Sequence, residues 1–104
     1  MIRKEYEKAY QLFNEYISLR DDYAYAWYYH GYLSEIYIND YDLAESSYRK
    51  ATSLDPNYPD PYYSLGVLYQ DIHKDNYKAD QFFKKSYDLG KRNHFLDNKF
   101  GKQE

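Results

Sequence analysis

Three histidines are the side chains of this chain best suited to acid–base chemistry or metal binding. They are His30, His73 and His94, and none has a second histidine or a suitable carboxylate at ligand spacing on its own helix. We expect His30 to be a packed or hydrogen-bonded helix residue, His73 to lie in a turn and His94 in the C-terminal tail. The sequence therefore predicts no metal site and no cofactor.

Nucleophilic and phosphate-binding motifs are also missing. Ser46, Ser47 and Ser64 fall in helical patterns, away from the strained turn that exposes a catalytic serine. The chain has no cysteine, and its four glycines lie too far apart to form a phosphate-binding loop. We therefore expect a protein that is not an enzyme.

Tyrosine is unusually frequent, with 17 tyrosines among 104 residues. A tyrosine ring can fill a helical core while its hydroxyl still reaches water, and it binds a partner with little loss of rotamer entropy. We expect most of these tyrosines to pack inside the protein and the rest to form a recognition surface.

The elements that must position these side chains recur every 35 residues. The like pairs at this shift include Gly31 with Gly66, Ala44 with Ala79, and Tyr48 with Phe83. Within one period, apolar residues follow one another at steps of three and four, which places them on one face of an α-helix. A period of this length indicates a helical repeat.

The helices should end where capping residues and prolines occur. Asp21-Asp22, Asn39-Asp40 and Asp75 offer side chains that cap a helix start, and Pro56 and Pro59 separate two helices. We predict helices over residues 3–19, 23–37, 41–54, 59–72 and 76–90, followed by a weak helical stretch from about 93.

The motifs resemble the tetratricopeptide repeat (TPR), whose aromatic, glycine, alanine and proline residues stand at fixed spacing. The matching residues are Trp27, Gly31, Ala44, Tyr48, Ala51 and Pro56 in one copy and Tyr62, Leu65, Gly66, Tyr69, Ala79 and Phe83 in the next. The resemblance implies an all-α, right-handed α-solenoid of antiparallel helix hairpins. It implies one domain over 1–104, with a leading half-repeat 3–22, repeats 23–57 and 58–92, and a tail 93–104.

Small residues at the matching positions allow close helix packing, so we expect Gly31 to face Ala44 and Gly66 to face Ala79. Two departures from the family pattern stand out. His30 occupies a position where the family usually has leucine, and the stretch from glycine to alanine is one residue longer than in the usual repeat. An insertion in that turn is also similar to the Sel1-like relatives.

In the TPR family the first helix of each repeat lines a concave groove that binds peptides. Carried over to this sequence, the groove would present Tyr25, Tyr28, Tyr32, Glu35, Ile36, Asp60, Tyr63, Val67, Gln70 and Asp71. Such an aromatic and acidic surface suits a protein or peptide that carries apolar anchors and some basic residues. The acidic tails of chaperones are disfavoured partners, because the basic residues that would grip them are missing.

Two other functions stay open. Residues 3–19 match only the second helix of a repeat, so another copy could cover the apolar face left there, and the chain would then be a self-assembling unit. A basic tail with Lys84, Lys85, Lys91, Arg92, Lys99 and Lys102 could bind RNA, although a net charge of -3 and the acidic groove disfavour nucleic acid.

The chain shows no secretory signal and no apolar run near the ~20 residues that a membrane span requires. We therefore expect a soluble, cytoplasmic protein that does not contact membranes.

Overall fold

The computed structural model describes residues 2–101, and these residues are helical except at the connections. The elements are α1 (Ile2–Leu19), α2 (Ala24–Leu33), the π-helical segment η1 (Ser34–Ile38), α3 (Tyr41–Leu54), α4 (Pro59–Asp71), α5 (Asn76–Asp88) and α6 (His94–Phe100). No strand occurs among residues 2–101. The predicted all-α class is confirmed, and each predicted helix is found within two residues of its expected bounds when α2 and η1 are counted as one.

Two further predictions concern the ends and the membrane. The predicted tail 93–104 forms α6 up to Phe100, whereas Lys102 and the rest of 102–104 lie outside the described residues. None of the helices in the described part of the chain combines the length and apolarity needed to cross a bilayer.

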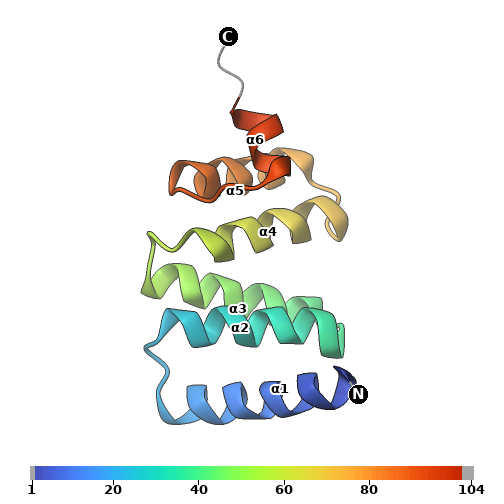
Figure 1. Cartoon of the computed structure of the whole chain (residues 1–104), viewed down its shortest axis with the longest axis vertical. Coiled ribbons are helices and arrows are strands. Elements are labelled where there is room, and N and C mark those ends of the chain that lie inside the picture. The colour runs from blue at the N-terminus through green and yellow to red at the C-terminus, as the bar shows by residue number, and fades with distance from the viewer. Residues whose placement is uncertain (1, 102–104) are drawn as a thin grey trace. The chain divides into compact units, whose positions relative to one another are not determined.

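The chain divides after Pro56 into two compact units. Unit 1 contains α1, α2, η1 and α3, and unit 2 contains α4, α5 and α6 (Figure 1). Each unit is built around an antiparallel helix hairpin, which is the element that stacks in helical-repeat proteins. The single domain, its repeat bounds and the right-handed stacking of the repeats stay predictions.

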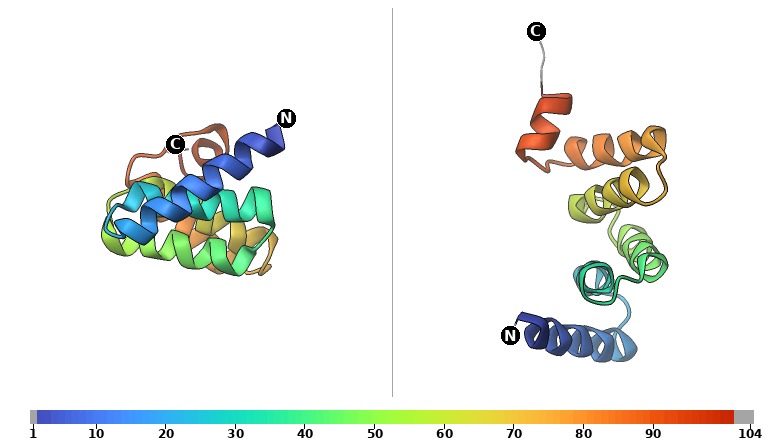
Figure 2. Two further views of the ribbon diagram at one scale, coloured as in Figure 1. Left: turned by 90° about the horizontal axis from the view of Figure 1, so that it is seen from below. Right: turned by 90° about the vertical axis from the view of Figure 1, so that its right-hand side faces the viewer.

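In unit 1, helices α2 and α3 form the hairpin and α1 packs on α2 (Figure 2). A Cβ atom placed on Gly31 would lie 2.8 Å from the Tyr48 ring and 3.1 Å from the Ala44 carbonyl oxygen. Only glycine allows α2 to approach α3 this closely. Ala44, Tyr48 and Ala51 are 0% exposed, so the predicted contact of Gly31 with Ala44 is confirmed.

In unit 2, helices α4 and α5 form the hairpin and α6 covers one end of its core. A Cβ atom on Gly66 would lie 2.5 Å from the Phe83 ring, which is the counterpart of the Tyr48 ring beside Gly31, and the contact of Gly66 with Ala79 stays a prediction. Ala79 and Phe83 form one buried cluster with Leu96 of α6. Leu96 stands 35 residues after the buried Pro61, which is the spacing of one repeat period.

The extra residue of the 35-residue period is accommodated in the turn of each hairpin. Asn39 and Lys74 have left-handed backbones, with φ 61° and 57°. The next residue, Asp40 or Asp75, donates its N–H to a carbonyl six residues earlier and caps the following helix through its carboxylate. In unit 1 the helix widens into η1 before this turn, and in unit 2 the chain leaves α4 at Asp71.

Candidate functional site

The predicted groove residues of unit 1 lie along α2 and η1. Tyr25, Tyr32 and Ile36 expose 46%, 40% and 36% of their surface. Their spacing of seven and four residues places them in one row on the helix surface. Tyr28 is half-buried, and its ring centroid lies 5.9 Å from that of Tyr48 on α3. The row is therefore open to a partner, whereas Tyr28 mainly packs inside the hairpin.

Glu35, the predicted acidic residue of this helix, is held by the neighbouring helix. The buried Tyr48 hydroxyl donates a hydrogen bond of 2.8 Å to the Glu35 carboxylate. A hydroxyl at that depth needs an acceptor, and the carboxylate supplies it. The second repeat has Phe83 and Gln70 at the equivalent positions, so this bond belongs to unit 1 alone.

In unit 2, the predicted groove residues Asp60 and Tyr63 both contact the side chain of Lys91. Lys91 forms an ion pair of 2.9 Å with Asp60, and its ammonium group lies 5.5 Å from the centroid of the Tyr63 ring. Tyr63 also contacts Phe83, with ring centroids 5.4 Å apart. These two predicted groove residues therefore take part in the packing of unit 2.

The remaining predicted groove residues lie further along α4. Val67 packs against the buried cluster of Ala79, Phe83 and Leu96. Gln70 and Asp71 are exposed, and the Gln70 side-chain amide donates to the Asp71 carboxylate at 3.4 Å. The open surface at this end of α4 is polar rather than aromatic.

The residues that carry the repeat pattern form the hairpin contacts. The buried ones are Gly31, Ala44, Tyr48, Ala51, Leu65, Gly66, Ala79 and Phe83, the half-buried ones are Trp27, Tyr62 and Tyr69, and Pro56 is exposed. The Trp27 indole N–H donates a hydrogen bond of 2.9 Å to the Asp21 carbonyl. This bond ties the loop before α2 to the body of that helix.

A polar cluster around the buried His30 joins the three helices of unit 1. His30 of α2 is 4% exposed, and its ring nitrogens lie 2.8 Å from the Ser47 hydroxyl on α3 and 2.7 Å from the Asn14 amide oxygen on α1. Its ring stacks on Tyr10 at 5.3 Å. Desolvation by burial lowers the pKa of His30 below its ordinary value. The prediction of a packed, hydrogen-bonded His30 is confirmed.

The Ser47–His30 pair has the residue types of a nucleophile and its base, but its position does not suit catalysis. Ser47 is 1% exposed and lies inside the regular helix α3. A catalytic serine must reach its substrate, usually from a strained turn. The cluster therefore connects α1 and α3 through α2 and satisfies the buried polar groups of His30 and Ser47.

The other histidines lie at the surface. His73 is exposed in the turn after α4, and His94 is exposed at the first residue of α6. Within residues 2–101, no group of three or more His, Asp and Glu side chains is placed to hold a metal ion.

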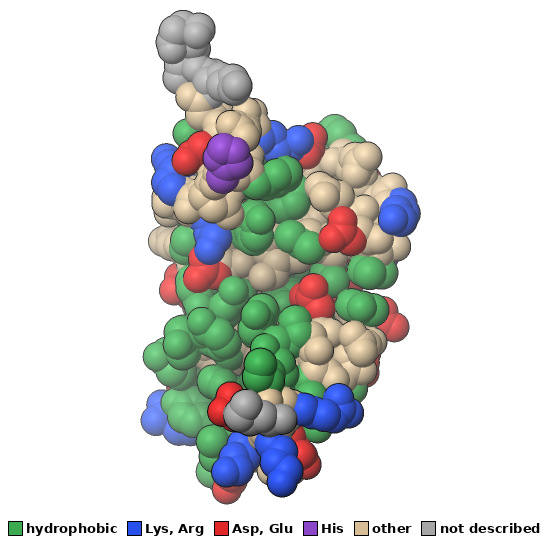
Figure 3. Space-filling model, turned by 45° about the vertical axis from the view of Figure 1, so that its right-hand side comes forward, with side chains coloured by type: hydrophobic (Ala, Val, Ile, Leu, Met, Phe, Trp, Pro, Cys, Tyr) green, Lys and Arg blue, Asp and Glu red, His purple; other side chains and the backbone are tan. Residues whose placement is uncertain are grey.

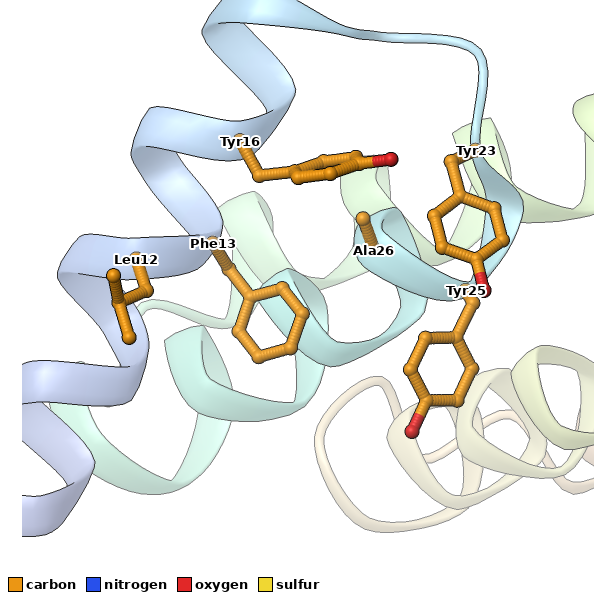
Figure 4. A pocket seen from close by; sticks show the side chains of 6 residues that line it. All are labelled: Leu12, Phe13, Tyr16, Tyr23, Tyr25 and Ala26. Atoms are coloured by element: carbon orange, nitrogen blue, oxygen red, sulfur yellow. The ribbon is translucent and has the colours of Figure 1, made fainter.

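Sequence reasoning missed a hollow between α1 and the start of α2. It has a volume of about 300 Å³ and is lined by Leu12, Phe13, Tyr16, Tyr23, Tyr25 and Ala26 (Figure 4). The helical periodicity placed Phe13 and Tyr16 on the packing stripe of α1. It carried no signal that the stripe would leave space opposite Tyr23 and Tyr25.

A second, wider hollow lies on α5 and α6. Its volume is about 610 Å³, and it is lined by Tyr77, Asp80, Gln81, Lys84, Lys85, Asp88 and Phe100. Charged side chains of both signs make up most of this lining, so it favours no single class of ligand.

Comparisons with known proteins agree with this architecture. A family model described as TPR repeat matches residues 34–72. The crystal structure of MamA, a TPR-containing protein, superposes with a TM-score of 0.73 at 27% sequence identity. The match covers 82% of this chain and 48% of MamA, so the chain spans about half the length of that neighbour. No curated protein sequence matches the chain.

Proposed function

The chain is a tetratricopeptide-repeat protein, and we propose that it is a non-catalytic docking scaffold that holds a protein or peptide along the exposed face of α2 and η1. The family consists in general of non-catalytic protein–protein interaction modules. One observation carries the proposal for this chain. The first helix of the hairpin in unit 1 exposes the aromatic and aliphatic row of Tyr25, Tyr32 and Ile36, although each is large and apolar enough to be buried.

The surface of unit 1 indicates the chemistry of the partner. Hydrophobic side chains gather on the face of unit 1 seen in the lower half of Figure 3. Ten acidic and six basic residues precede Pro56, so unit 1 carries a net negative charge. A partner with apolar anchors and basic residues would gain from both features, because apolar anchors supply affinity and unlike charges speed the encounter. Acidic tails would be repelled.

The proposal is tested by removing the row without touching the hollow at the start of α2. Tyr32→Ser with Ile36→Ser should lower the affinity for a partner captured by the wild-type chain at least tenfold. Two side chains that become buried on binding contribute roughly 1–2 kcal/mol each. The partner is identified by affinity capture and mass spectrometry, and its affinity is then measured by calorimetry.

Tyr77→Ser on α5 is the matched control, because Tyr77 is a 75% exposed tyrosine of unit 2. Circular dichroism establishes that both variants remain helical. Unchanged partner affinity in a folded Tyr32→Ser, Ile36→Ser chain would remove the row as the docking surface.

Self-assembly is the second candidate, and one observation favours it. Leu12 and Leu19, seven residues apart on α1, are 65% and 77% exposed. A second copy of the chain would remove both side chains from water. Light scattering over a concentration series should then show a dimer that Leu19→Glu dissociates. A mass of one chain at every concentration would exclude this function.

A further inference from the structure

Four aromatic rings surround the hollow between α1 and the start of α2. We call Phe13, Tyr16, Tyr23 and Tyr25 the aromatic cage. Figure 4 shows their rings around the space, with Leu12 at one side and Ala26 between the two helices. The rings turn against one another rather than stacking, with interplanar angles of 54° between Tyr16 and Tyr23 and 33° between Tyr23 and Tyr25.

The cage packs against another ring of α2 on one side and is exposed to solvent on the other. Tyr29 contacts Phe13 and Tyr25, with ring centroids 5.8 Å and 4.7 Å apart. Tyr16, Tyr23 and Tyr25 nevertheless remain 38%, 50% and 46% exposed. A ligand group can therefore enter from solvent and meet rings whose positions are already constrained, which limits the entropy lost on binding.

The electrostatics of the cage favour a cation. Each aromatic ring has a negative face that attracts positive charge. Elsewhere the chain supplies its own cations, such as Arg92 over Tyr87 at 3.8 Å. Within residues 2–101, no lysine or arginine lies over a ring of the cage.

Two carboxylates strengthen this preference. Asp21 and Asp22 directly precede Tyr23 in the loop that borders the cage. Arg20 pairs with Asp22 at 3.6 Å, whereas the Asp21 carboxylate has no basic partner in the described part of the chain. The end of α1 and the start of α2 meet here, and their opposed dipoles offset each other. The loop therefore adds net negative charge beside the rings.

The lining also discriminates among cations. Leu12, Phe13, Ala26 and the tyrosine ring faces make the lining mainly apolar, and the hydroxyls of Tyr16, Tyr23 and Tyr25 are its polar groups. A primary ammonium group is strongly hydrated, so it would lose more hydration free energy than a trimethylammonium group on entering this hollow. A trimethylammonium group has no donor to lose and covers its charge with methyl groups that pack against the rings.

We propose that the aromatic cage binds the trimethylammonium group of a methylated lysine on the docked partner. The inference rests on the proposed docking function, since it specifies one side chain of that partner. Tyr32 and Ile36 of the exposed row would contact the partner's apolar anchors, and the cage, which shares Tyr25 with the row, would bind one modified lysine.

The test titrates the full chain with three short peptides of identical sequence. One carries trimethyllysine, the second unmodified lysine, and the third a neutral isostere in which carbon replaces the ammonium nitrogen. Nuclear magnetic resonance of the Phe13, Tyr16, Tyr23 and Tyr25 ring signals reports binding. Trimethyllysine should bind about tenfold more tightly than either relative, as expected for a desolvated cation–π contact. Equal binding of the isostere, equal binding of lysine, or no binding of trimethyllysine would each overturn the proposal.

Matched variants locate the effect. Tyr23→Leu should lower the affinity for trimethyllysine about tenfold, whereas Tyr23→Phe should retain it because the ring face is kept. Tyr77→Leu on α5 is the control for loss of an exposed tyrosine and should change nothing. Undiminished binding by a folded Tyr23→Leu chain would contradict the cage. The short peptides contain no partner sequence, so they test the cage alone, while loss of partner capture in Tyr32→Ser, Ile36→Ser tests docking.

Discussion

At the scale of the residue, the surroundings of each tyrosine decide its role. Tyr48 is fully buried and satisfies its hydroxyl on Glu35, whereas Tyr28 packs its ring inside the hairpin. Tyr32 lies on the outer face of α2 and remains exposed. The ring supplies apolar area in all three places, and the hydroxyl makes the exposed position tolerable in water. A high tyrosine content is therefore compatible with both a core and a binding surface.

His30 makes the stability of unit 1 depend on pH. Its pKa is lowered by burial from about 6.5, so the unfolded chain takes up a proton at a higher pH than the folded chain does. The free energy of unfolding should therefore decrease as the pH falls through about 6.5 toward the lowered value. His30→Leu removes this contribution. The loss of urea midpoint on going from about pH 7 to about pH 5 should be smaller in His30→Leu than in the wild type.

The measured quantity is the change of the urea midpoint with pH, and its absolute value is not compared. His30→Leu also leaves Ser47 and Asn14 without their shared partner, which lowers the stability at every pH. Ile72→Leu, at an exposed position without a titratable group, is the control and should keep the wild-type pH dependence. An identical pH dependence in His30→Leu and the wild type would show that His30 does not titrate differently on folding.

At the scale of the element, the two hairpin turns share one backbone geometry, but the residue at the left-handed position differs between them. Asn39 and Lys74 hold equivalent left-handed positions, and Asp40 and Asp75 cap the helices that follow. Asparagine tolerates a left-handed backbone because its short polar side chain bonds locally, whereas lysine has no such compensation. The turn after α4 therefore contains strain that the turn after η1 largely avoids.

Lys74→Gly should stabilise the protein by about 0.5–1 kcal/mol, because glycine adopts the left-handed conformation without steric cost. Asn39→Gly should give a smaller change. Chemical denaturation followed by circular dichroism measures both. Lys84→Gly, within α5, is the matched control and should destabilise by about 1 kcal/mol. A loss of stability in Lys74→Gly would contradict the strain inferred from its φ of 57°.

At the scale of the whole molecule, each compact unit has its own buried centre. Tyr48 occupies that of unit 1, and Phe83 the equivalent place in unit 2 with Ala79 and Leu96. Truncating either ring leaves a cavity that helices can close only in part, at a cost of roughly 3–5 kcal/mol for Phe83→Ala. The truncation should act first on the unit that contains it.

Hydrogen exchange checks this expectation. Phe83→Ala should reduce amide protection in α4, α5 and α6 more than in α1, α2 and α3, and Tyr48→Ala should do the reverse. The two variants thus serve as controls for each other. Equal loss of protection throughout the chain in both variants would show that the units unfold as one.

The sequence alone predicted the helices, their period and the small residues at the hairpin contacts. These features are local: a stripe at steps of three and four, an aspartate cap at Asp40 or Asp75, and Gly31 against Ala44 each need only one helix or its neighbour in the chain. The predicted groove residues were found on α2, η1 and α4, but their use in binding stays a prediction.

Tertiary structure decided what those helices present to one another. The Asn14–His30–Ser47 cluster needs side chains from three helices to meet, and the aromatic cage needs side chains of α1 to lie opposite those at the start of α2. The π-helical segment η1 likewise follows α2 in unit 1 and has no counterpart after α4 in unit 2, although both hairpins contain the extra residue. No periodicity within a single helix encodes the distance or rotation between two helices, since these follow from how their side chains pack together.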